Sequence, residues 1–485
     1  MFRSFMVRQS TCALVLGLLV APGTVHAATP TAESPVTSPL ADPAGILTGK
    51  PGGLTAEELA KRATDTSPTA ARQRQEVEAA EAQLHKASYD FIPRLSGTAA
   101  VARLSPVNNS LGAVVASPGA QPGPADPNSL VVVPLELRSK QSSVSLSSSL
   151  NVPVSDYLLR FFQAHAGAKA QLKASRWSLQ AATRKVDYDA RSLYYGWVGA
   201  ELDHAVAEQH LELSREHLQR VQALLSAESA SEADVARVQA SLAKSESTVV
   251  ETGNNVLLQR QRIRIALHDP SAPDFEIGED LRATPSPRPE LDNLAQLLDL
   301  AARSRPEIRA LEQQGRAYEK QADAAYAQAL PRLDGFFQLT LANPNSRYLV
   351  QDDKYHGSWQ LGLQLSYSPN DSLSGGTQIT NLRARERAAQ EQRNEALDAL
   401  RADVTSAVLS HRNAIANLDT SQRRLTAAET SYRARRELYQ VGRATTVELT
   451  EAQTELYNAK LDAVRAQVAI RVARTRILYV TGRDG

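Results

Sequence analysis

Apolar and polar side chains alternate along four stretches of about ten residues, at 95–103, 144–152, 333–341 and 359–367. In the clearest stretch, Trp359, Leu361 and Leu363 alternate with glutamine and glycine. A period of two predicts a strand with one apolar and one polar face, and about ten residues is the length at which a tilted strand crosses a bilayer. Phe336 is an exception to the alternation. The pattern therefore predicts membrane strands whose polar faces line a water-filled lumen.

Two much longer segments, 157–224 and 372–438, contain no proline, and each would extend roughly 100 Å as a helix. Helices of that length are expected to pack as coiled coils. The last helix shows the seam, because its apolar residues recur at alternating steps of three and four: Leu449, Ala452, Leu456, Ala459, Ala463, Ala466, Ile470, Ala473 and Ile477. This repeat predicts left-handed supercoiling, with alanines that allow close approach of helices. Segment 235–263 keeps the same frame at Val235, Val238, Leu242, Ser245, Val249, Thr252, Val256, Gln259 and Ile263.

The chain is an internal duplication. Residues 68–97 match 306–335 without gaps, most clearly where Pro93-Arg94-Leu95 recurs as Pro331-Arg332-Leu333, and 227–268 match 441–482 more weakly. Each copy is expected to run helix, strand, loop, strand, long helix, tip and helix. The first helix begins at the capping pattern Thr55-x-x-Glu58 and continues to Pro93, and its counterpart runs from about Pro306 to Pro331. The segments 105–140 and 343–358 are predicted to be polar loops.

These observations give the domain organisation. Residues 1–27 are expected to be a signal peptide, 28–54 a flexible N-terminal segment, 55–268 the first repeat, 269–289 a Pro-rich linker and 290–482 the second repeat. The two repeats are expected to form one continuous unit. The signal has a basic start, a short apolar core and the small-x-small pattern Val25-His26-Ala27, which predicts export and a mature chain from Ala28.

Composition excludes several classes of function. The only cysteine, Cys12, lies within the predicted signal, so we expect neither disulfides nor a thiol nucleophile. The formal net charge of +1 carries no basic excess that would indicate nucleic acid as a partner. After the signal, no segment approaches 18 consecutive apolar residues, so no membrane-spanning helix is predicted.

Three histidines, His204, His210 and His217, raise the question of a metal site. His210 and His217 share a helix face but lie about 10 Å apart along the axis, which is too far for one ion. No HExxH motif, nucleophile–histidine–acid order or phosphate-binding loop is present. We therefore expect no metal, no cofactor and no catalytic residue, and interpret the protein as a non-enzyme.

Four membrane strands cannot close a barrel, and an open strand edge facing lipid leaves backbone groups without partners. The chain must therefore oligomerise, and three copies would supply twelve strands. Several short motifs also resemble a known family. The segment Tyr439-Gln440-Val441-Gly442-Arg443, followed by Leu456-Tyr457-Asn458-Ala459-Lys460, resembles the second-repeat tip of TolC-type outer-membrane efflux proteins. Arg305-Pro306-Glu307-Ile308 and Leu330-Pro331-Arg332-Leu333 resemble that family's entry into the second strand pair.

The resemblance implies a mixed, mostly α fold. Three chains would share a 12-stranded outer-membrane β-barrel, with four strands from each chain, and a long α-helical coiled-coil tunnel in the periplasm. It implies the outer-membrane channel of a tripartite efflux or type I secretion system, a passive conduit with a gate at its tip. Its partners would be two further copies of itself in a homotrimer, a periplasmic adaptor (membrane fusion) protein, an inner-membrane pump and outer-membrane lipid.

The resemblance also assigns site residues. Tyr439, Arg443, Glu448, Glu451 and Asp234 correspond to the periplasmic gate, and Val441, Gly442 and Arg443 to the adaptor-docking tip. Arg443 lies one place before the family's usual basic position, which holds Ala444 here, and the first copy has Ala227-Glu228-Ser229 without the tip glycine.

Simpler explanations compete for the same residues. The sequences Thr445-x-x-Glu448 and Ser231-x-x-Asp234 are capping boxes. In this alternative, both acids serve only to cap the N-termini of their helices. Tyr439 could be a packing residue, and Glu451 one solvated charge. A different class of function also remains: a soluble periplasmic coiled-coil scaffold or adaptor would share the heptads, but it would lack the amphipathic strands.

Overall fold

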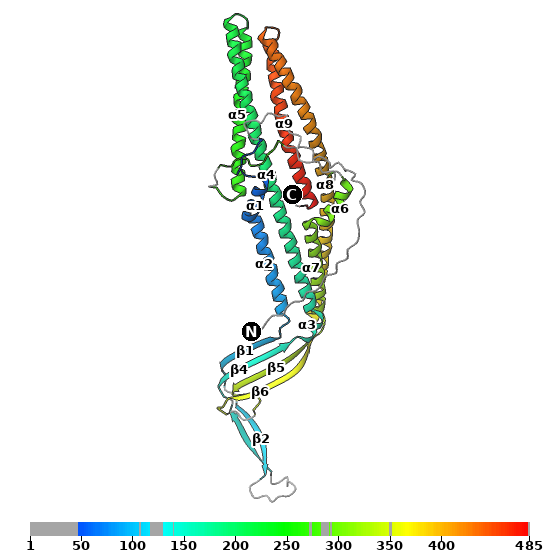
Figure 1. Ribbon diagram of the computed structural model, residues 1–485. Coiled ribbons are helices and arrows are strands. Elements are labelled where there is room, and N and C mark those ends of the chain that lie inside the picture. The colour runs from blue at the N-terminus through cyan, green and yellow to red at the C-terminus, as the bar shows by residue number, and fades with distance from the viewer. Residues whose placement is uncertain are drawn as a thin grey trace, which may run out of the picture.

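The computed structural model describes residues 47–105, 108–116, 130–138, 140–270, 274–282, 291, 293–348 and 352–483. The expected signal peptide, 1–27, lies outside these residues, as does most of the segment 28–54. The described part forms one elongated column of helices, with a β-sheet at one end (Figure 1). The turns of two helical hairpins lie at the other end (Figure 1). None of its helices is long and apolar enough to cross a membrane.

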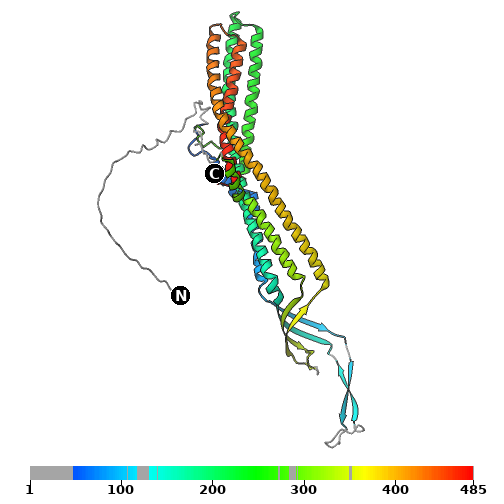
Figure 2. The ribbon, with the colours of Figure 1, turned by 90° about the vertical axis from the view of Figure 1, so that its right-hand side faces the viewer.

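Two helical hairpins make up most of the column. In the first repeat, α4 (Phe161–Ser226) turns back into α5 (Glu232–Ala266), and in the second, α8 (Pro369–Gln440) turns back into α9 (Thr446–Thr481). The 66 residues of α4 and the 72 of α8 give lengths of about 100 Å. Both hairpin turns lie at the same end of the molecule, at the top of Figure 1 and of Figure 2. The expected long helices are therefore confirmed, although a short helix α3 (Val154–Leu159) precedes α4.

The predicted seam of α9 is confirmed, because all nine of its residues are buried, and Ala459 and Ile477 are completely inaccessible. This helix packs against both α8 and α4. In α5, which packs mainly on α4, the equivalent nine positions are buried or half-buried. The same 3.5-residue spacing of apolar residues therefore occurs in helices with different surroundings. Helix α9 packs mainly against two helices, whereas α5 packs mainly against one.

Proline divides the helices that lead from the column to the sheet. The first repeat has α1 (Ala56–Thr66) and α2 (Pro68–Tyr89), and the second has α6 (Leu294–Ser304) and α7 (Pro306–Gln328). Each proline occupies the first turn of its helix, where a missing N–H costs nothing. The prediction of one unbroken helix from Thr55 was therefore wrong, because Ser67, in an extended conformation, caps a new helix. Helix α6 was missed altogether.

Four antiparallel strands form the main sheet, in the order β1 (Arg94–Arg103), β4 (Ser142–Val152), β5 (Arg332–Asn343) and β6 (His356–Ser366). One row across the sheet pairs Leu95, Leu150, Phe337 and Leu361, and the next row, on the opposite face, pairs Ser96, Ser149, Gln338 and Gln360. The serine hydroxyls are 2.7 Å apart, and the two glutamine amides are joined by a 2.6 Å hydrogen bond. The predicted two-faced sheet is confirmed.

The exception, Phe336, lies on the polar face. It pairs with Gly362, and a Cβ added to that glycine would lie 2.8 Å from the Phe336 ring. The glycine thus gives the ring room against the sheet.

The segment 105–140, which was expected to be a loop, contains two strands that were not predicted from its sequence. Strands β2 (Asn108–Ala116) and β3 (Leu130–Arg138) pair as a two-stranded ribbon that extends beyond the main sheet (Figure 2). The Pro- and Gly-rich composition of the whole segment concealed two short runs of valine and leucine, and these runs pair with each other.

Part of the expected flexible segment and part of the linker are held together. Residues 47–54 and 274–282 form a strap in which Leu54 bridges Ile277 in parallel, and backbone N–H groups of Lys50 and Leu54 donate to carbonyls across it at 2.7 Å. Gly53 and Gly278 cross so closely that a Cβ on Gly278 would lie 2.2 Å from the Gly53 carbonyl oxygen. Within the segment 28–54, Leu47 and Leu54 join the main core.

Candidate functional site

The two hairpin turns have the same backbone design. Gly442 takes φ +72° and Glu228, 214 positions earlier, takes φ +58°. In both turns the next residue donates its N–H to a carbonyl five positions back, from Arg443 to Leu438 at 2.9 Å and from Ser229 to Leu224 at 2.8 Å. This arrangement closes a helix by satisfying its last carbonyls. The first repeat therefore keeps the tip turn without the glycine.

Each returning helix begins with a complete capping box, Ser231 with Asp234 for α5 and Thr445 with Glu448 for α9. The Ser231 hydroxyl and backbone N–H donate to Asp234 and lower the pKa of its carboxyl. The Thr445 backbone N–H, followed by the Arg435 guanidinium, lowers the pKa of Glu448. Both carboxylates thus favour the folded helix starts above their ordinary pKa, and this contribution is lost as the pH falls through the lowered values.

Tyr439 is buried rather than exposed at the tip. Its ring packs with Val221, Val238 and Leu449, and its hydroxyl lies 3.4 Å from the Thr446 hydroxyl. The ring of His217, from α4, meets it edge-on at 5.6 Å. Tyr439 therefore belongs to the small core that joins the α4–α5 hairpin to the α8–α9 hairpin near their turns.

The remaining predicted residues lie at the surface. Val441 is 68% exposed, and Gly442, Arg443 and Glu451 are exposed beside it. Among the described residues, neither Arg443 nor Asp234 takes part in an ion pair. The structure thus brings Tyr439 and Glu448 together with the start of α9 and leaves Asp234 on the other hairpin. The exposed segment 441–443 projects from the end of the column.

Several polar residues that were not predicted from the sequence join the two hairpins along α4 and α9. The Thr450 hydroxyl contacts His217 Nε2 at 3.3 Å, and Gln453 donates to the Leu213 carbonyl at 3.3 Å. Farther from the tip, Arg465 forms a two-pronged ion pair with Asp203, with N–O distances of 3.0 to 3.2 Å. The signal was present in the polar residues of α9 that flank its apolar seam, but the partner helix could not be assigned from one sequence.

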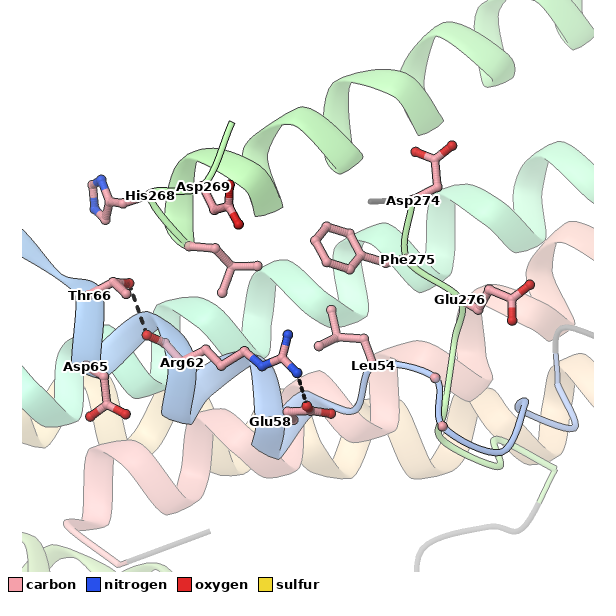
Figure 3. Close-up of a pocket in the computed structure, with 13 residues that line it drawn as sticks. Leu54, Glu58, Arg62, Asp65, Thr66, His268, Asp269, Asp274, Phe275 and Glu276 are labelled. Atoms are coloured by element: carbon pink, nitrogen blue, oxygen red, sulfur yellow. Dashed lines mark hydrogen bonds and ion pairs between the residues drawn. The ribbon is translucent and has the colours of Figure 1, made fainter. Parts of the chain in front are cut away.

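A cavity of about 750 Å³ lies near the middle of the column, where α1 faces the strap. Figure 3 shows acidic side chains around an apolar floor that includes Leu54 and Phe275. Three of these acids are already paired: Glu58 with Arg62, Asp274 with Arg264 and Glu276 with Lys50. In the described residues, no group of three or more His, Cys, Asp or Glu side chains is placed to hold a metal ion.

Comparison with known proteins identifies this architecture. Residues 297–483 match the family described as outer membrane efflux protein. This match covers the second repeat, from helix α6 to the end of α9. No curated protein matches it by sequence.

Solved structures of outer-membrane channels share the fold of this chain. The outer-membrane channel OprN is 18% identical, with a TM-score of 0.69 over 92% of this chain and 97% of that one. The CmeC channel of Campylobacter jejuni is 14% identical, with a TM-score of 0.67 over 90% and 89%. The MtrE channel of Neisseria gonorrhoeae, in its open state, is 15% identical, with a TM-score of 0.69 over 94% and 96%. At such low identity these likenesses establish the fold.

The family match and the shared channel fold together place this protein in the outer membrane, with its helical column in the periplasm, and support the role of an efflux channel rather than an enzyme. The alternative of a soluble periplasmic scaffold does not fit these matches. The resemblance found in the sequence to TolC-type efflux proteins is confirmed.

Proposed function

We propose that three copies of this efflux protein form one passive conduit from the periplasm to the outside, as the outer-membrane component of a tripartite efflux or type I secretion system. The energy would come from an inner-membrane pump, reached through a periplasmic adaptor. The channel itself supplies a wetted path and a gate at the hairpin tips.

The open edges of the sheet carry this proposal. Strands β1 and β6 are the outer members of the sheet, so each has one edge without a strand partner among the described residues. On β6, Trp359, Leu361 and Leu363 are 64%, 71% and 73% exposed on the apolar face. Backbone edges need partners within a bilayer, and three four-stranded sheets joined edge to edge close into twelve strands. The apolar faces then meet lipid, and the polar rows of serine and glutamine line the lumen.

The helical column gives independent support for neighbouring copies. Helix α5 packs on α4 but leaves Val250, Leu257 and Ile265 exposed at 63%, 64% and 61%. These side chains recur at intervals of seven and eight residues and therefore lie along one face of the helix, and exposed apolar side chains grouped in this way are typical of a contact surface. We propose that it packs against the next copy in the trimer.

Detergent extraction, light scattering and planar bilayers test the assembly. The full-length channel should stay with outer membranes after a high-salt wash, elute as three chains and conduct ions once its tip is loosened. A monomer that remains in solution without detergent would contradict the proposal.

We further propose that Tyr439, Arg443, Glu448, Glu451 and Asp234 form the gate, and that Val441, Gly442 and Arg443 dock the adaptor. In a trimer, three copies of Glu448 and Glu451 would form acidic rings near a constriction and favour cations. The lowered pKa of Glu448 keeps this charge at neutral pH.

Replacing Glu448 separates gating from helix capping. Glutamine is also accepted at this position of a capping box, so Glu448→Gln keeps the helix start while it removes the charge and the ion pair with Arg435. We expect a weaker cation preference in planar bilayers for Glu448→Gln and for Glu451→Gln.

Glu455→Gln is the matched control, because Glu455 is an exposed acid farther along α9 that is paired with Arg424. This variant should keep the selectivity of the unmodified channel. If Glu448→Gln also keeps it, Glu448 serves only to begin its helix.

A further inference from the structure

Two histidines of α4 lie between the α4–α5 hairpin and the α8–α9 hairpin. His217 is buried against Tyr439 of α8 and Thr450 of α9. His210, seven residues away, is stacked on Tyr457 of α9 with ring centroids 4.5 Å apart. We call these two residues the inter-hairpin histidines. Both rings contact residues of the α8–α9 hairpin, so these contacts bear on how the two hairpins sit against each other.

The hydrogen bonds around His217 define its protonation. The Thr450 hydroxyl donates to the Thr446 carbonyl at 2.8 Å, so towards His217 it can only accept. His217 Nε2 must therefore carry the hydrogen, and the neutral ring keeps its lone pair on Nδ1. That Nδ1 atom is buried and has no hydrogen-bond partner among the described residues. A second proton would place a buried N–H and a positive charge where this part of the chain offers no acceptor.

The charged form of His210 is disfavoured as well. It lies near Lys460 of α9 and Lys244 of α5, and Lys460 is held close because it donates to Gln209 at 3.1 Å. A charged imidazole would gain some attraction to the Tyr457 ring. Burial, and then the two nearby ammonium groups, oppose that charge.

We propose that the inter-hairpin histidines hold the α8–α9 hairpin against α4 while they are neutral, and that acid releases the hairpin by protonating them. This inference rests on the proposed tip gate, because the released hairpin carries Tyr439, Glu448 and the exposed tip 441–443. Export through the channel would then respond to acidification of the periplasm.

The charged groups around both rings also favour the neutral form of each histidine in the closed arrangement. Burial, and then Arg220 of the same helix, lowers the pKa of His217 to about 4. Tyr439 is the titratable group that α8 presents to it, and α9 presents the uncharged Thr450 and Gln453. Burial, and then Lys460 and Lys244, lowers the pKa of His210 to about 4.

The sign of the effect follows from these shifts. A histidine released into water regains its ordinary pKa of about 6.5, so the closed form is fully favoured above that pH. Between pH 6.5 and about 4, each histidine shifts the open-to-closed ratio by up to tenfold per pH unit.

Spin labels on the two tips of one chain would measure the release directly. Ser229 and Val441 are exposed, one in each turn, and the only natural cysteine is Cys12 of the expected signal. Full-length channel carrying Ser229→Cys and Val441→Cys, diluted with unlabelled chains, reports the separation of the hairpins by pulsed electron resonance. We expect this distance to increase and broaden from pH 7.5 to 4.5.

Substitution of both histidines should abolish that change. His217→Gln keeps a side-chain donor for Thr450, and His210→Phe keeps the stack on Tyr457, but neither side chain can take up a proton. His204→Gln is the matched control, because His204 contacts Thr252 of α5 within one hairpin. The control should open with acid as the unmodified protein does.

Two results would overturn the inference: tips that do not separate in acid, or tips that separate equally in the double variant. Planar-bilayer conductance of the same proteins tests the proposed function separately. A channel that never conducts at any pH refutes the conduit, while the tip distances still decide the role of the histidines.

Discussion

Single residues at the two tip turns decide how easily each hairpin closes. Both turns need a residue with positive φ. Gly442 adopts this conformation without steric cost, whereas in Glu228 it brings Cβ close to the following carbonyl oxygen. The sequence could show that the first copy lacks the glycine. It could not show that the turn survives, because the hydrogen bonds that enforce it depend on the rest of the hairpin.

We predict opposite effects from exchanging these residues. Glu228→Gly should stabilise its turn by about 1 kcal/mol, and Gly442→Ala should destabilise the other turn by a similar amount. Hydrogen exchange of the last turns of α4 and α8 measures both changes.

Glu228→Ala serves as the control, because it removes the charge but keeps the strained φ. If it stabilises the turn as much as Glu228→Gly does, charge rather than backbone strain is the cause.

The contacts of Tyr439 could not be predicted from the tip motif alone. Its position in the tip pattern was visible in the sequence, and so was the alternative that it packs. Its burial against Val221, Val238 and Leu449 supports the packing role, and its contact with His217 connects that packing to the other hairpin. Contacts between segments more than 200 residues apart cannot be read from a local pattern.

At the scale of elements, periodicity predicted what repeats and missed what does not. The α9 seam and the two-faced strands follow from regular patterns, because burial on one side imposes a fixed spacing. The strap has no period. It depends on two glycines that cross and on Glu279, whose carboxylate accepts from the Tyr195 hydroxyl at 3.2 Å and faces the buried Arg471.

We predict that Glu279→Gln loosens the strap. Burial raises the pKa of Glu279 and lowers that of Arg471, so each charge depends on the other for compensation. Losing one charge should cost about 1–3 kcal/mol and speed exchange of the strap N–H groups of Lys50, Leu54 and Gly278 roughly tenfold or more.

Glu276→Gln, in the same strap, tests the same chemical change at an exposed pair with Lys50, whose side chains are 60% and 64% accessible. Its cost should stay below about 1 kcal/mol. Equal effects of the two variants would show that the buried pair has no special part in anchoring the strap.

At the scale of the whole molecule, the two faces of the sheet should respond differently to charge. Leu361 and Gln360 are neighbours on β6 and lie on opposite faces at the centre of the strand. Leu361→Arg should lower the yield of channel in the outer membrane, because arginine at mid-bilayer on the lipid face costs about 2–4 kcal/mol per chain.

Gln360→Arg should assemble normally, because its side chain would enter a wetted lumen. Fractionation and the amount of detergent-resistant oligomer compare the two. A greater loss with Gln360→Arg would mean that the polar face, rather than the apolar face, meets lipid.

Helix α4 packs against α1, α2, α5 and α7, and its contact with α9 comes last in the chain. Leu461, Val464 and Val468 of α9 complete the core around Tyr194, Trp197 and Val198 of α4. Because a polypeptide crosses the inner membrane progressively, α4 reaches the periplasm before α9 and exposes the apolar face that α9 later covers. During this interval the exposed apolar surface would need protection by a chaperone. A nascent chain interrupted before α9 should be degraded rather than assembled.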